Sequence, residues 1–168
     1  NPMALLISIP ILGGLAMLQS VIVSKVPLLL GTTDLVLVAL IAWAVQDKVK
    51  SAWQWSLLGG GIMTILSGLP LGVYLVAYLG ATFIAALIRR RIWKVPFLGM
   101  LTAVFIGTML LHVLSWLSRQ IFGVNIPIDQ ALVLIMLPSI LLNLLVAVPV
   151  YFILKDIANR LYTEEIEV

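Results

Sequence analysis

The sequence predicts an all-α, polytopic membrane protein with six transmembrane helices, and three observations lead to this fold class. First, 62% of the 168 residues are hydrophobic and 10% are charged, whereas soluble domains are about 45–50% apolar and about 25% charged. Second, the apolar residues form six runs near the length of roughly 20 residues that a membrane helix needs. Third, most cations lie on alternate connections. We therefore expect one transmembrane domain without an extramembrane catalytic domain.

The first two runs contain residues that bend or break a membrane helix. The first run includes Pro10 and the pair Gly13-Gly14, which a membrane helix tolerates because neighbouring helices satisfy the backbone groups that are freed. The second run is interrupted at residues 31–34, Gly-Thr-Thr-Asp. We expect the helix to break there, and Asp34 or a threonine to cap the part that starts at Leu35.

The other four runs are delimited by a glycine-rich turn, a basic cluster and a polar loop. The turn lies at residues 68–72, the basic cluster follows the fourth run, and Asn125 and Pro127 mark the loop between the last two runs. The predicted spans are residues 4–24, 26–45, 52–68, 72–88, 95–117 and 131–154, followed by a polar tail over residues 155–168, all within a single domain of residues 1–168.

The cations are distributed unevenly over the two sides of the predicted bundle. Six spans place the N-terminus, the connections after the second and fourth spans and the tail on one side, and only Lys25 and Arg119 of the ten Lys and Arg residues lie on the other. The densest cluster comprises Arg89, Arg90, Arg91 and Lys94. Because basic segments stay in the cytoplasm, we expect both termini and this cluster to be cytoplasmic.

The five tryptophans lie near the ends of the predicted runs. An indole ring is amphipathic and prefers the headgroup region of the bilayer. We therefore expect membrane-interface positions for Trp43, Trp53, Trp55, Trp93 and Trp116.

Three consecutive spans carry small residues at every fourth position, a pattern that lets helix backbones approach closely in lipid. The three stripes are Gly60, Thr64, Gly68 and Gly72; Ala77, Ala81 and Ala85; and Gly99, Ala103 and Gly107. Such stripes pack a bundle internally or dock the helix of a partner. The sequence leaves both uses open.

Four polar side chains are predicted at membrane depth, where an ionisable group is costly and marks a candidate functional site. They are Asp34, His112, Asn143 and Gln19. Asp34 has three candidate roles: a helix cap, a buried contact with another span, or coordination of an ion or substrate. His112 shares its predicted depth, so an Asp34–His112 pair is geometrically possible. Asn143 and Gln19 are suited to hydrogen bonds between helices.

The sequence carries no recognisable catalytic or metal-binding motif. It has no G-x-S-x-G, H-E-x-x-H or P-loop pattern, and it has no cysteine. Its formal charge of +3 is too small to imply a nucleic-acid partner. We therefore expect no enzymatic activity, no catalytic residue, no cofactor and no metal.

Four local patterns are distributed along nearly the whole chain. They are Asp-Leu-Val-Leu-Val at residues 34–38, Leu-Ser-Gly-Leu-Pro-Leu-Gly at 66–72, the basic residues after the fourth span, and Asn-Leu-Leu-Val-Ala-Val-Pro-Val-Tyr at 143–151. In their order and spacing they resemble the MreD family of bacterial rod shape-determining membrane proteins. The chain departs from the family at Thr64, where members often carry an aspartate.

The resemblance implies a non-enzymatic scaffold of the cell-elongation machinery in the bacterial cytoplasmic membrane. Such a subunit binds MreC through membrane helices and links MreB filaments to the RodA glycosyltransferase and its partner transpeptidase. It also implies a fold similar to the substrate-binding subunits of energy-coupling-factor vitamin transporters, which gives the alternative function. Those subunits dock through an Ala-rich ladder on the first helix, where this chain has only Gly13, Gly14 and Ala16.

Overall fold

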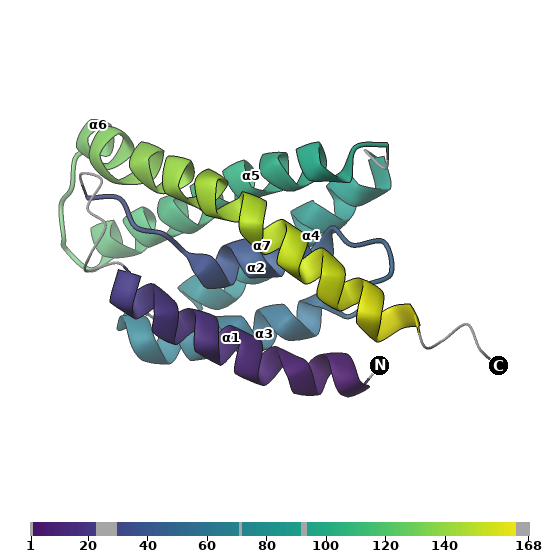
Figure 1. The fold of residues 1–168 in the computed structure, drawn as a ribbon. Coiled ribbons are helices and arrows are strands. Elements are labelled where there is room, and N and C mark those ends of the chain that lie inside the picture. The colour runs from purple at the N-terminus through teal and green to yellow at the C-terminus, as the bar shows by residue number, and fades with distance from the viewer. Residues whose placement is uncertain (1, 23–29, 71, 92–93, 164–168) are drawn as a thin grey trace.

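A computed structural model describes residues 2–22, 30–70, 72–91 and 94–163 of the chain, and the described residues form a helical bundle without β-strands (Figure 1). The helices are α1 (Pro2–Ile22), α2 (Leu35–Ala44), α3 (Ala52–Ser67), α4 (Val73–Arg91), α5 (Pro96–Ile121), α6 (Ile128–Gln130), the π-helical turn η1 (Ala131–Met136) and α7 (Leu137–Thr163). Because α6, η1 and α7 follow one another without a break, the described chain contains six helical segments.

Four of these described segments are long and apolar enough to cross a membrane, namely Pro2–Ile22, Val73–Arg91, Pro96–Ile121 and Ile128–Tyr162. The prediction of an all-helical membrane protein is therefore confirmed. The helices within the second and third predicted spans are shorter, at 10 residues for α2 and 16 for α3. Within the predicted second span, residues 26–29 lie outside the described part, as does Lys25 before it.

Helix α2 forms the core of the bundle and packs against α1, α3, α4, α5 and α7 (Figure 1). All ten of its residues are buried. A helix of this length reaches only about 15 Å along its axis, so it does not cross a bilayer of about 30 Å. Backbone that ends at membrane depth is tolerated where protein buries it, and the neighbouring helices provide that burial here.

An extended segment, residues 30–34, leads into α2 and lies along η1 and α7. The backbone N–H of Leu30 donates to the carbonyl of Leu134 over 3.1 Å. Pro138, four residues after Leu134, has no N–H to donate to that carbonyl. The same proline leaves no room for a side chain at position 31, since a Cβ on Gly31 would lie 2.6 Å from the Cβ of Pro138. A glycine is therefore required for the segment to approach the helix.

The last helix extends beyond the predicted sixth span at both ends. Its helical structure begins at Ile128, and α7 continues to Thr163, nine residues past the predicted end. Asp156 and Arg160, which were assigned to the tail, form an exposed i,i+4 pair with an N–O distance of 2.9 Å on this extension. Residues 164–168 of the predicted tail lie outside the described part.

Two tryptophans predicted at the membrane interface lie inside the bundle instead. The rings of Trp43 and Trp55 are fully buried and stacked, with centroids 4.3 Å apart and an interplanar angle of 16°. The position of each tryptophan near the end of an apolar run did not predict this burial. The two rings stack on each other and join α2 to α3, so neither ring faces the lipid headgroups. Trp53 is exposed, and Trp93 lies outside the described residues.

Candidate functional site

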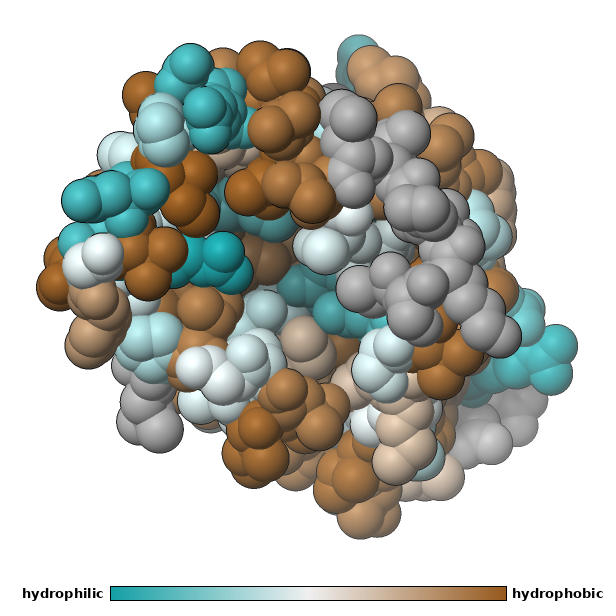
Figure 2. Space-filling view, turned by 90° about the vertical axis from the view of Figure 1, so that its left-hand side faces the viewer, coloured by the Kyte–Doolittle hydropathy of each residue, from teal (hydrophilic) through white to brown (hydrophobic). Residues whose placement is uncertain are grey.

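A cavity of about 370 Å³ opens at the end of the bundle where α2 begins, and we call it the Asp34 cavity. Figure 2 shows it as a hollow with hydrophilic residues in its depth. Its walls come from the ends of several helices and from their connections. The lining residues are Gln19, Leu30, Thr32, Asp34, Leu69, Tyr74, Leu111, His112, Ser115, Trp116, Arg119, Ile126, Ala131, Ile135 and Met136.

Asp34 lies at the cavity floor and caps α2. Its Oδ1 accepts a hydrogen bond from the backbone N–H of Leu37 over 2.9 Å, which is the N-cap that the sequence predicted. The hydroxyl of Tyr78 on α4 also lies within hydrogen-bond distance of both carboxylate oxygens, at 3.0 and 2.7 Å. Asp34 is thus both a helix cap and a buried contact with another helix, two roles that the sequence had treated as alternatives.

Gln19 and Asn143 complete the polar contacts around the start of α2. The Oε1 of Gln19 accepts from the backbone N–H of Leu35 over 2.9 Å. The Oδ1 of Asn143 accepts from the backbone N–H of Asp34 over 2.8 Å, and its Nδ2 donates to the Thr108 hydroxyl over 3.0 Å. Both side chains therefore make the interhelical hydrogen bonds expected of them.

Ser139 on α7 holds the extended segment, residues 30–34, at Thr32. Its hydroxyl accepts from the backbone N–H of Thr32 over 2.9 Å and donates to the carbonyl of Ile135 over 2.6 Å. The segment is consequently tied to the last helix at residues 30, 32 and 34. Sequence inspection singled out Asn143 on that helix but not Ser139, since a serine is common in membrane helices and has no distinctive spacing here.

Arg89 satisfies the opposite end of α2. Its Nη1 lies 3.1 Å from the carbonyl oxygen of Ala44 and 2.8 Å from those of Gln46 and Val49. The carboxylate of Asp34 and the guanidinium of Arg89 therefore sit at the N- and C-terminal ends of the same buried helix, which is the favourable arrangement for its dipole. The sequence placed Arg89 in a cytoplasmic cluster and missed this role, whereas Arg90, Arg91 and Lys94 are exposed as expected for such a cluster.

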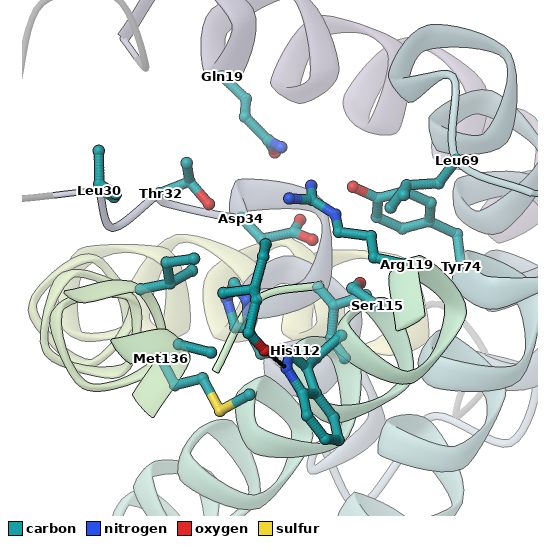
Figure 3. Close-up of a pocket in the computed structure, with 15 residues that line it drawn as sticks. Gln19, Leu30, Thr32, Asp34, Leu69, Tyr74, His112, Ser115, Arg119 and Met136 are labelled. Atoms are coloured by element: carbon teal, nitrogen blue, oxygen red, sulfur yellow. Dashed lines mark hydrogen bonds between the residues drawn. The ribbon is translucent and has the colours of Figure 1, made fainter. Parts of the chain in front are cut away.

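His112 and Asp34 line the same cavity, and no hydrogen bond joins them among the described residues. Two further polar side chains that the sequence analysis did not select, Tyr74 and Arg119, point into it (Figure 3). Tyr74 lies four residues before Tyr78 on α4, a spacing that places both on one face of the helix. This spacing is the sequence signal that could have identified the two tyrosines, Tyr74 and Tyr78, as neighbours.

The small-residue stripes of α4 and α5 face each other inside the bundle. Ala77, Ala81, Ala85 and Ala103 are fully buried. A Cβ on Gly107 would lie 3.0 Å from the Cβ of Ala81. These positions therefore serve internal packing.

The remaining stripe positions lie at helix contacts or in the turn before α4. A Cβ on Gly60 would meet Leu75, and one on Gly99 would meet Ile88. The hydroxyl of Thr64 donates to the Gly60 carbonyl over 2.7 Å. Gly68 and Gly72 have φ of 66° and 108° with open space around a Cβ, so the turn requires them for their backbone conformation.

The arrangement holds polar and charged groups around a buried helix end. His112 and Ser115 of α5 both line the cavity, and among the described residues no hydrogen bond joins the two side chains. Among the described residues no group of three His, Asp or Glu side chains is placed to hold a metal ion. The long apolar helices and this internal polar site define the class of the molecule as a multi-pass helical membrane protein.

Comparison with known protein families identifies the family to which the chain belongs. The family model for rod shape-determining protein MreD matches residues 3–160, and the chain belongs to this family. The family is part of the Mre rod-shape complex with MreC and MreB. No curated protein and no solved structure matches the chain, so the expected likeness to energy-coupling-factor transporter subunits gains no support.

Proposed function

We propose that this protein is a non-enzymatic scaffold of the cell-elongation complex, which docks the membrane helix of MreC and connects MreB to RodA and its partner transpeptidase. The observation that carries the proposal is the family match over residues 3–160. We further propose that the six helical segments are all embedded in the membrane, with both termini in the cytoplasm.

The docking surface that the structure favours lies between α1 and α7. The Ala and Gly stripes of α4 and α5 are used inside the bundle, so they offer no surface to a partner. An apolar groove of about 280 Å³ is lined by Ile11, Gly14, Leu15, Leu18, Val150, Ile153, Leu154 and Ile157. We assign this groove to the MreC helix, because a membrane helix packs best where a glycine permits close approach and a Cβ on Gly14 would have open space.

Replacing Gly14 with leucine is expected to reduce recovery of MreC with the tagged protein in mild detergent by at least roughly tenfold, the equivalent of about 1.4 kcal/mol of binding free energy. The added side chain would occupy the groove, and its Cβ would not clash with the bundle, because nothing lies within 4 Å of a Cβ at this position. Copurification from membranes, with expression and thermal unfolding of the variant measured in parallel, tests this.

Gly13→Leu is the matched control. Gly13 lies in the same helix, has equally open space around a Cβ, and is not among the residues that line the groove. It should retain MreC. Equal recovery of MreC with both variants would exclude the α1–α7 groove as the docking surface while leaving the family membership unaffected.

The proposed orientation predicts a specific labelling pattern. Asn125 and Arg90 are both exposed. The connection from α5 to α6, which contains Asn125, and the C-terminal end of α4, which contains Arg90, lie at opposite ends of the bundle (Figure 1), and the chain has no native cysteine. A membrane-impermeant maleimide added to intact spheroplasts should label Asn125→Cys and not Arg90→Cys, since basic connections stay in the cytoplasm. Labelling of Arg90→Cys without labelling of Asn125→Cys would show the opposite orientation. In disrupted cells, both cysteines should be labelled.

A further inference from the structure

We infer that the Asp34 cavity binds a zwitterionic group that joins a primary ammonium to a phosphate, as in an aminophospholipid headgroup or free phosphoethanolamine. This site is separate from the α1–α7 groove, so the inference goes beyond the proposed scaffold function. It rests on two opposite charges that face one cavity without pairing with each other. Neither charge has an ion-pair partner among the residues that the structure describes.

The negative charge is the Asp34 carboxylate on the floor. Its side chain is buried, with 5% of the residue exposed, and it lines the cavity. Its hydrogen-bond donors are the backbone N–H groups of Leu37 and Val36 and the hydroxyl of Tyr78. An ionised carboxylate has about four acceptor sites, so three donors leave capacity for a further donor from the cavity. A primary ammonium supplies donors together with the opposite charge.

The positive charge is the guanidinium of Arg119 near the end of α5. Figure 3 shows this side chain and those of Gln19 and Tyr74 pointing toward the space beside Asp34. A guanidinium offers five N–H donors in a planar fork that suits a phosphate. Gln19 and Tyr74 lie beside it with neutral polar groups. The cavity therefore combines an anion site near Arg119 with a cation site at Asp34.

The separation of the two charges favours one ligand that carries both. No ion pair within 4.0 Å joins Asp34 to Arg119, which is exposed in the last turn of α5, and a buried carboxylate at membrane depth is costly unless it is paired. The volume of about 370 Å³ falls within the range of small-molecule sites. The rest of the lining is largely apolar, including Leu30, Leu69 and Met136, which suits the glycerol and first acyl carbons next to a headgroup.

The test measures thermal unfolding of the purified full-length protein in detergent with added ligands. Short-chain phosphatidylethanolamine should raise the unfolding midpoint in a saturable manner. Phosphatidylglycerol, which lacks the ammonium, and phosphatidylcholine, whose quaternary ammonium has no N–H donor, should not. Free phosphoethanolamine separates the two sources: an equal effect assigns the site to a soluble zwitterion, and a weaker effect assigns it to the lipid.

Two variants locate the binding in the Asp34 cavity. Asp34→Asn and Arg119→Gln should each weaken phosphatidylethanolamine binding on the order of tenfold or more. Asparagine can still cap α2, and the Arg119 side chain makes no ion pair among the described residues, so at least the second variant tests the site even if the first folds poorly. Asp129→Asn and Arg160→Gln remove the same charges at exposed positions outside the cavity and should bind normally.

Three results would overturn the inference. They are equal stabilisation by all three phospholipids, no stabilisation by any of the four ligands, and unchanged phosphatidylethanolamine binding by Arg119→Gln. Recovery of MreC should be unaffected by Arg119→Gln. Failure of the lipid experiment therefore leaves the scaffold proposal intact, and failure of the Gly14→Leu experiment leaves this inference intact.

Discussion

Arg89→Ala is expected to destabilise the protein by about 2–3 kcal/mol, because it removes a charged hydrogen-bond donor from carbonyls at the end of a buried helix. The Nη1 of Arg89 lies within hydrogen-bond distance of the carbonyl oxygens of Ala44, Gln46 and Val49. Ala44 and Val49 are buried, so water does not readily replace the lost donor. The favourable interaction of the cation with the C-terminal end of α2 is lost as well.

Arg90→Ala is the matched control for this prediction. Arg90 is the next residue, lies in the same helix and carries the same charge, but it is exposed. It should lose less than about 0.5 kcal/mol, as expected for a surface substitution. Arg89→Lys should be intermediate, because a lysine keeps the charge but has no planar fork. Equal thermal unfolding of Arg89→Ala and Arg90→Ala in detergent would show that these carbonyl contacts do not stabilise the fold.

The break before α2 could be predicted from the sequence because its cause is local. Glycine and two threonines interrupt an apolar run, and the aspartate that follows is a preferred N-cap residue. The structure starts α2 at Leu35 with Asp34 as the cap. The all-helical class of the protein was accessible for a similar reason, since it depends on the length and composition of apolar runs.

The tertiary partners of that helix could not be predicted, because several residues satisfied the same sequence criterion. Any of the three arginines in the last turn of α4 could have remained in solvent, and only the packing of α4 against α2 places Arg89 beside the carbonyls. Tyr78 was not selected for a similar reason. A tyrosine in an apolar helix has no sequence signal for the residue that its hydroxyl will contact.

The small-residue stripes were ambiguous because close packing has the same sequence requirement inside a bundle and against a foreign helix. The structure resolves the ambiguity for α4 and α5, whose alanines are buried against neighbouring helices of the same chain. Gly14 of the first helix belonged to no regular stripe, yet it lines an apolar groove between α1 and α7. Spacing alone therefore does not separate an internal contact from an available surface.

Gly107→Leu is expected to destabilise the bundle by about 3 kcal/mol, at the upper end of the usual cost of overpacking. A Cβ at this position would already lie 2.8 Å from the Cδ1 of Ile41 and 3.0 Å from the Cβ of Ala81. The Ile41 side chain is long enough to adjust, but the Ala81 Cβ moves only with the backbone of α4. A leucine would therefore force α4 and α5 apart and disturb α2, which packs against both.

Gly61→Leu separates this steric effect from the general consequences of replacing a glycine in a membrane helix. Gly61 lies in α3, and nothing is within 4 Å of a Cβ built on it. Its replacement should leave thermal unfolding in detergent unchanged or raise its midpoint, because leucine has a higher helix propensity than glycine. Gly107→Ala should fall between the two, since the first carbon already meets Ala81. If Gly107→Leu unfolds at the same temperature as Gly61→Leu, α4 and α5 do not pack at the separation that makes a glycine necessary.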